Sequence, residues 1–216
     1  MILRQNVKFT LISFITPRGQ MASSRAQKQT DAILKSLGIF RASDAIEKGI
    51  SQPSLSRMAK EGTLVRLEHG IFMHRDFDKP EHVDFIVACL RTGPDSVIGG
   101  LTALAYYVLV EQVPTQTWVM IPNSNKGTYK NYRVLRTKHD PKVEIVDNAT
   151  WRIVTIERAI LEAFAYSTKM GYQTALTAAR TALAEKKTTE SKLQNAAKRL
   201  GIRPLLIKNW EAITTK

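Results

Sequence analysis

The side chains best suited to chemistry lie close together in the chain, and their types suit contacts with nucleic acid better than catalysis. Hydroxyl, amide and cationic groups hydrogen-bond phosphate oxygens and base edges. In a helix with about 100° per residue, Arg57 and Lys60 would point away from an apolar stripe that begins at Leu55. The alternative is a solvated polar face that binds nothing. The candidate DNA-binding residues are Ser51, Gln52, Ser54, Ser56, Arg57, Lys60, Arg66 and His69.

Spacings typical of catalytic sites are missing from the sequence. A nucleotidyltransferase needs a Gly-Ser pair and then two acidic residues one position apart, whereas Gly99-Gly100 is followed by the single acid Glu111. A metal-dependent nuclease needs an acid-x-Lys sequence, and Glu144 lacks that lysine. The histidines and Cys89 show no zinc-ligand spacing, and no glycine-rich phosphate loop is present. We therefore predict no enzyme, no catalytic residue, no metal site and no cofactor.

Two short helices joined by a turn would position the candidate side chains. Ala42, Ala45 and Ile46 recur at helical spacing and indicate the inner face of the first helix. Gly49 can end that helix in a left-handed conformation, and Ser51 can cap the next one through its hydroxyl. The order of these signals predicts a helix-turn-helix.

A predicted hairpin follows directly. Residues 64–67 and 71–73 read as two strands around Glu68-His69-Gly70, with Gly70 needed for the tight turn. The whole stretch, residues 40–73, predicts a winged helix-turn-helix whose second helix would enter a DNA major groove. Arg66 and His69 would then lie beside the phosphate backbone or the minor groove. The alternative is a small helical subdomain without a ligand, in which the hairpin only seals the core.

The rest of the pattern predicts an α+β fold: an N-terminal winged helix-turn-helix followed by a C-terminal domain with a small sheet and several helices. A helix is expected at residues 23–37. We divide the chain into a DNA-binding domain, residues 21–80, and a C-terminal domain, residues 81–216. The C-terminal pattern predicts helices at residues 83–90, 99–109, 156–166, 172–184, 189–200 and 204–213, and strands at 117–121, 132–136 and 152–154.

Residues 1–20 have a faint likeness to a signal peptide, but their apolar run is short and no small-residue cleavage site follows. We expect a tail there, or a mis-assigned start with translation beginning at Met21. No stretch is long enough to span a bilayer. The lone Cys89 allows no internal disulfide, which suits a reducing cytosol. The chain is therefore expected to be cytoplasmic, without a membrane partner.

The formal net charge of +13 is unevenly distributed. Basic and acidic residues number 10 and 7 over residues 21–80, 7 and 7 over residues 81–150, and 12 and 5 over residues 151–216. The C-terminal excess indicates either a second phosphate-facing surface or a solvated basic face. Tyr129 and Tyr132 could stack on bases or pack in the core. The outward charges of the C-terminal helices are predicted to be Lys186, Lys187, Lys198 and Arg199.

Four segments, in this order, carry a resemblance to a known family that runs from about Thr30 to Ala212. They are GISQPSLSRMAKEGTLVRLEHGIFM, LTALAYYVLVEQVPTQTWVMIP, WRIVTIERAILEAFAYSTKMGYQTALTAAR and LQNAAKRLGIRPLLIKNWEA. With this layout the chain resembles the AbiEi family of type IV antitoxins and related transcriptional regulators. It departs from the family at Tyr107-Val108, where His-Gly is frequent, and after Arg158, where Thr and then Asp are frequent.

The resemblance implies a function for each half. The winged helix would bind operator DNA and repress its own toxin–antitoxin operon, a system of abortive infection and phage defence. The C-terminal domain would oppose a nucleotidyltransferase toxin without a stable complex, with Lys186, Lys187, Lys198 and Arg199 as the candidate antitoxin surface. The alternative is a stand-alone winged-helix regulator whose C-terminal domain binds a small ligand or a protein.

Overall fold

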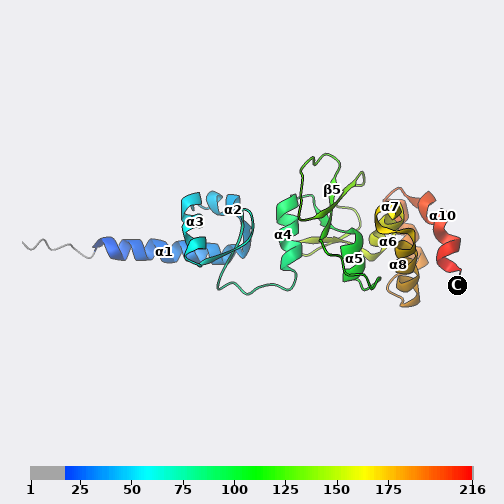
Figure 1. Ribbon diagram of the computed structural model, residues 1–216, viewed down its shortest axis with the longest axis horizontal. Helices are drawn as coiled ribbons and strands as arrows, with labels where there is room; N and C mark the ends of the chain where they lie inside the picture. Colours follow the sequence, from blue (N-terminus) through cyan, green and yellow to red (C-terminus); the bar gives the residue numbers. More distant parts are fainter. Residues whose placement is uncertain (1–17, 216) are drawn as a thin grey trace, which may run out of the picture.

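The computed structural model describes residues 18–215, and describes side chains from residue 25 onward. The first part of the described chain has the element order and sheet of a winged helix (Figure 1). A three-stranded antiparallel sheet has the strand order β1-β3-β2. The elements are α1 (Arg18–Leu37), β1 (Ile39–Arg41), α2 (Ala42–Glu47), α3 (Gln52–Lys60), β2 (Leu64–Glu68) and β3 (Ile71–His74). We call residues 18–80 the winged-helix part and residues 81–215 the C-terminal part.

Local signals explain the boundaries in the winged-helix part. Gly49 has a φ of 84° after α2, and Gly70 has a φ of 74° in the turn between β2 and β3, a region that glycine adopts without strain. Ser51 caps α3 by accepting a hydrogen bond from the backbone N–H of Ser54. The core of this part is formed by Leu34, Phe40, Ala45, Ile50, Leu55, Met58, Leu64 and Phe72.

Two expectations for this part are wrong. Ile46 is 48% exposed and does not belong to the inner face of α2, because Ala45 and then Ile50 occupy the core positions of this short helix and its turn. The first helix begins at Arg18 rather than at residue 23. Met21 and Ala22 are good helix formers, so the helix continues on the N-terminal side of the two serines. The prediction of a tail lies mostly outside the described residues.

The C-terminal part combines a mixed five-stranded sheet, of order β6-β5-β4-β8-β7, with helices. The α+β fold class predicted from the sequence is confirmed. Strands β1, β4 and β7, of two or three residues each, were not predicted, because so few residues rarely show an alternating pattern. The elements are α4 (Val83–Thr92), β4 (Val97–Ile98), α5 (Gly100–Tyr106), β5 (Trp118–Pro122), β6 (Arg133–Thr137), β7 (Ile145–Asp147), β8 (Arg152–Val154), α6 (Ile156–Ala165), α7 (Ser167–Met170), α8 (Tyr172–Ala184), α9 (Glu190–Arg199) and α10 (Arg203–Thr214).

Helix α5 ends three residues earlier than predicted. Val108 has a φ of 53°, and the N–H groups of Val108 and Leu109 donate to the carbonyls of Ala105 and Leu104, both at 2.9 Å. This is the hydrogen-bond pattern of a Schellman motif, which normally has glycine at the left-handed position.

Helix α4 lies at the side of the C-terminal part that faces the winged-helix part (Figure 1). It packs against β1 and β3 on one side and against β4 and β5 on the other. Strand β3 is buried along its whole length: Phe72 points into the winged-helix core, so Ile71 and Met73 point to the opposite face, toward α4. A division of the chain at residue 80 therefore crosses an apolar contact, and the two-domain description stays a prediction.

Candidate nucleic-acid interface

Helix α3 is held by a narrow apolar stripe and exposes the remainder of its surface. Leu55 and Met58 are buried, and Ala59 is partly buried beside them. On the outer side, the exposed residues are Ser51, Gln52, Ser56, Arg57 and Lys60, with Ser54 partly exposed. The arrangement leaves amide, hydroxyl and cationic groups together on one helix, as a base-reading surface requires.

Two of the predicted DNA-binding residues, Ser51 and Ser54, also stabilise the start of α3. The hydroxyls of Ser51 and Ser54 lie 2.9 Å apart, and Ser51 Oγ also accepts from the Ser54 N–H at 3.4 Å. Their first role is therefore to cap α3. Gln52, Ser56 and Lys60 have no side-chain hydrogen bond or ion pair within the described part of the chain.

Arg57 lies at the side of α3 that faces α1. Its side chain is 65% exposed, and its Nε lies 4.0 Å from Glu61 Oε1, a long distance for an ion pair. A groove of about 370 Å³ separates the two helices, and its lining includes Arg57, Gln27, Asp31 and Ser54. Because the contact with Glu61 is long and exposed, it holds Arg57 weakly.

The hairpin presents Arg66 and His69, and both side chains are exposed. The Arg66 guanidinium carbon lies 5.6 Å from the centre of the Phe72 ring, directly across the strand pair. Arg66 therefore covers an edge of the core and can reach solvent with its charged end. His69 occupies the turn itself. The geometry accommodates both the DNA-facing and the core-sealing interpretations of the hairpin.

Tyr129 and Tyr132 are not free to stack on bases. Both pack against the C-terminal core. The Tyr129 hydroxyl donates to Asn125 Oδ1 at 3.1 Å, and the Tyr132 hydroxyl donates to Glu68 at the end of β2. Of the two alternatives raised by the sequence, the structure favours packing.

The four predicted outward charges of the C-terminal helices differ in their surroundings. Lys186 and Lys198 are exposed. Lys187 is not an outward charge, because its ammonium donates to the carbonyls of Tyr107 and Val108 at 3.0 Å and pairs with Glu185 at 2.7 Å. It caps the end of α5, a tertiary contact that the sequence could not reveal.

Arg199, the fourth, has a side chain that is 60% exposed and pairs with the nearly buried carboxylate of Glu144. That carboxylate also accepts from the Thr155 hydroxyl at 3.1 Å. The four residues therefore do not form one continuous free cationic surface.

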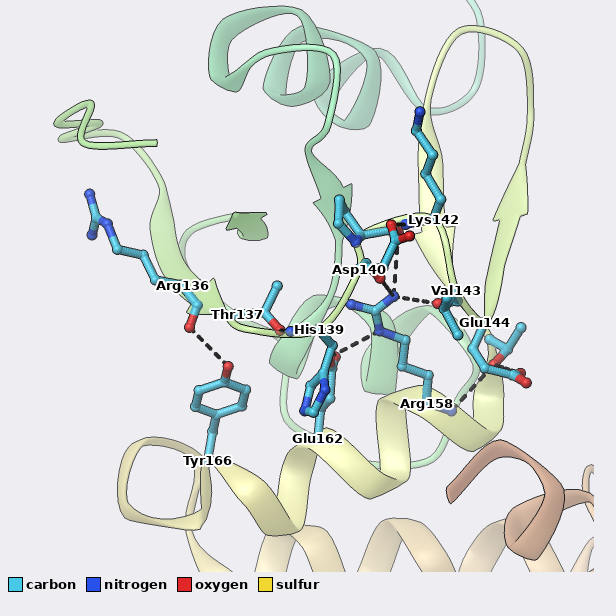
Figure 2. A network of polar contacts seen from close by, with 12 residues as sticks. Arg136, Thr137, His139, Asp140, Lys142, Val143, Glu144, Arg158, Glu162 and Tyr166 are labelled. Atoms are coloured by element: carbon cyan, nitrogen blue, oxygen red, sulfur yellow. Dashed lines mark hydrogen bonds and ion pairs between the residues drawn. The ribbon is translucent and has the colours of Figure 1, made fainter. Parts of the chain in front are cut away.

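Sequence reasoning missed a buried polar network around α6 (Figure 2). Arg158 and Glu162 are both fully buried, and Arg158 Nε donates to Glu162 Oε1 at 2.9 Å. Arg158 Nη1 donates to the carbonyls of Asp140 at 3.2 Å, Pro141 at 3.3 Å and Val143. One side chain thus ties the segment between β6 and β7 to α6. The signal in the sequence was an Arg–Glu pair four residues apart in a largely apolar helix.

The Arg158–Glu162 pair makes one hydrogen bond rather than the two that a bidentate pair makes. Arg158 Nη2 and Glu162 Oε2 have no hydrogen-bond partner. Burial raises the pKa of Glu162 to about 7, although Arg158 lowers it through its charge and hydrogen bond. Partial burial, and secondarily the Arg158 charge, lower the pKa of the neighbouring His139. The network can hold the segment between β6 and β7 against α6.

Groups suited to catalysis are not assembled in the described residues. No group of three or more histidine, cysteine or acidic side chains could hold a metal there. Cys89 is buried in α4, and burial raises the pKa of its thiol, which disfavours the reactive thiolate. None of the described helices is long and apolar enough to cross a membrane.

Residues 27–73 match a family model described as "Transcriptional regulator, AbiEi antitoxin". The matched segment runs from α1 to the end of the hairpin and contains every predicted DNA-binding residue. The resemblance drawn from the sequence is confirmed for this segment. No curated protein matches the chain significantly.

Proposed function

We propose that this protein is a sequence-specific DNA-binding repressor that controls its own operon and acts as the antitoxin of that operon. One observation carries the proposal. Helix α3 presents an exposed polar and basic face on a buried apolar stripe, within the segment that matches antitoxin transcriptional regulators. A helix-turn-helix uses such a helix to read the major groove.

The proposed roles follow from side-chain chemistry and exposure. Gln52 and Arg57 offer amide and guanidinium groups for base edges, the pairing that gives specificity. Lys60 is a point charge suited to a phosphate. Arg66 and His69 extend the contact to the backbone or the minor groove along the hairpin. We expect the protein to act in the cytoplasm, where it would meet operator DNA, with no membrane partner.

The antitoxin role concerns the C-terminal part. We propose that it opposes a nucleotidyltransferase toxin and that the protein is not itself an enzyme. Lys186 and Lys198 remain the exposed candidates for this role, because Lys187 and Arg199 are engaged within the chain. Two separate exposed charges are consistent with opposing the toxin without forming a stable complex with it.

DNA binding is tested by titrating the full chain against a labelled duplex from the region upstream of its own gene, with random duplex as competitor. We expect the complex with the upstream duplex to persist at competitor concentrations that dissociate a complex with random DNA, since the affinity for a specific site exceeds the affinity for non-specific DNA by roughly 10³-fold or more. A Lys208→Ala variant, which removes an exposed charge from α10, should bind like the wild type. Equal affinity for upstream and random DNA would refute the repressor proposal.

The antitoxin role is tested by co-expression with the adjacent gene. If that gene encodes a nucleotidyltransferase that arrests growth, the full chain should restore growth. A Lys186→Glu/Lys198→Glu variant should protect less well, and it should still bind the upstream duplex. Full protection by this variant would remove the proposed surface. Failure of the wild type to protect would leave a stand-alone regulator as the interpretation.

A further inference from the structure

Glu68 ends β2 immediately before the turn of the hairpin, and three side chains of the C-terminal part converge on it. Arg91 Nε, at the end of α4, lies 3.4 Å from Glu68 Oε1. Asn131 Nδ2 donates to the same oxygen at 3.4 Å, and the Tyr132 hydroxyl donates to Oε2. We call these four residues the Glu68 latch.

The latch satisfies a carboxylate that is largely removed from water. The Glu68 side chain is 15% exposed, so each donor offsets part of its desolvation. Burial, and secondarily the bond to Glu68, raise the pKa of Tyr132, which keeps its hydroxyl protonated as a donor. The register of β2 against β3 shifts between Arg66 and Glu68. Such a break in the ladder can redirect a side chain, and here the Glu68 carboxylate meets the C-terminal part.

The turn of the hairpin is tied to the start of α2 by a backbone hydrogen bond, from the Ala42 N–H to the Gly70 carbonyl at 2.8 Å, whereas clefts flank its contact with the C-terminal part. On one side of the latch a cleft of about 470 Å³ is lined by His69, Ser43 and Asn125, among others. On the other side a cleft of about 480 Å³ is lined by Leu67, Lys79 and Thr117, among others. Helix α4 supports the strands through Ile71 and Met73, whereas the tip meets the C-terminal part mainly through polar contacts.

We infer that the Glu68 latch fixes the hairpin in the orientation that binds DNA, so that the C-terminal part sets operator affinity through residues that need not touch the DNA. This inference rests on the proposed repressor function. Holding the tip in place beforehand avoids an ordering cost on binding. A partner that draws Asn131 or Tyr132 away from Glu68 would release the hairpin and weaken repression.

The cleanest variant is Tyr132→Phe, because it removes one hydrogen bond without changing any charge near the DNA. We expect its affinity for the upstream duplex to fall about two- to tenfold, with an unchanged salt dependence because no phosphate contact is lost. Tyr129→Phe is the matched control. It removes a hydroxyl from the same loop that bonds only within the C-terminal part, and it should bind like the wild type.

A second measurement does not depend on DNA. Hydrogen exchange of the free full-length protein should show faster exchange of backbone amides in residues 66–71 for Tyr132→Phe, and not for Tyr129→Phe. In a double-mutant cycle, adding Tyr132→Phe to Glu68→Gln should cost less affinity than Tyr132→Phe costs alone. The inference is overturned if Tyr132→Phe matches Tyr129→Phe in exchange and affinity. Faster exchange without any DNA binding by the wild type would instead refute the repressor function.

Discussion

The two parts of the molecule contain the same local pair in opposite environments. Arg57 of α3 and Glu61, the C-cap of that helix, stand four residues apart, and Arg57 Nε lies 4.0 Å from the Glu61 carboxylate with both side chains more than half exposed. In α6, Arg158 and Glu162 have the same spacing, lie 2.9 Å apart and are fully buried. Identical spacing therefore leaves one arginine available to a partner and commits the other to the fold. The surroundings of a pair, and not its spacing, decide its role.

The largest expected effect follows from breaking the buried pair. Glu162→Ala should lower the free energy of unfolding by about 3–5 kcal/mol, because Arg158 would remain as an uncompensated buried charge. Chemical denaturation of the full chain measures the loss. Glu61→Ala is the matched control in the exposed pair and should change stability by less than about 1 kcal/mol. Equal effects of the two substitutions would contradict the comparison.

The buried pair should also make stability depend on pH. Because the pKa of Glu162 is raised from 4.5 to about 7, the folded state binds its proton more tightly than the unfolded state. Protonation of Glu162 therefore adds to the free energy of unfolding. This stabilisation is fully present below pH 4.5 and is lost as the pH rises to about 7, with an upper limit of about 3 kcal/mol. Denaturation of the wild type and Glu162→Gln across this range gives the difference.

The prediction concerns how steeply the free energy of unfolding changes with pH, and not its absolute value. His139 has a lowered pKa and contributes with the opposite sign, since its unfolded state binds more protons in slightly acidic solution. That contribution is present in both proteins and largely cancels in the comparison. Parallel pH profiles for the wild type and Glu162→Gln would show that Glu162 is already ionised at acidic pH.

Substitutions on the exposed face of α3 should change DNA binding much more than they change stability. Arg57→Ala should weaken binding to the upstream duplex by about 1–3 kcal/mol and relax specificity at one base pair, if Arg57 pairs with a guanine edge. Its stability should change little. Lys60→Ala should weaken specific and random DNA alike and reduce the salt dependence. A gel-shift titration of both variants against both duplexes checks this. An Arg57→Ala variant with wild-type affinity and specificity would remove that residue from the interface.

The same contrast explains what could be predicted from the sequence. Local signals identified α3 and the hairpin: a serine cap, an apolar stripe and the left-handed glycines Gly49, Gly62 and Gly70 follow one another along a single short segment. The Glu68 latch and the three carbonyls bound by Arg158 join segments far apart in the chain, which no local pattern reports. Lys187 was misjudged for the same reason. Its charge was visible in the sequence, but the end of α5 that it caps was not.

Helix ends provide the smallest and sharpest test of the comparison. Gly49 after α2 and Val108 after α5 both have positive φ, 84° and 53°. The end of α2 thus has the residue that this conformation favours, whereas the end of α5 has a β-branched residue that it strains. Val108 is 69% exposed, so replacing it with glycine loses little burial. Relief of strain in the folded state competes with the greater freedom of glycine in the unfolded chain. We expect the net effect of Val108→Gly to be a stabilisation of about 0.5–1 kcal/mol.

The control is Val113→Gly, at a position that is 83% exposed and does not have a positive φ. It should lower the melting temperature or leave it unchanged. A lower melting temperature for Val108→Gly than for Val113→Gly would mean that Val108 contributes more through its contacts than it costs in backbone strain.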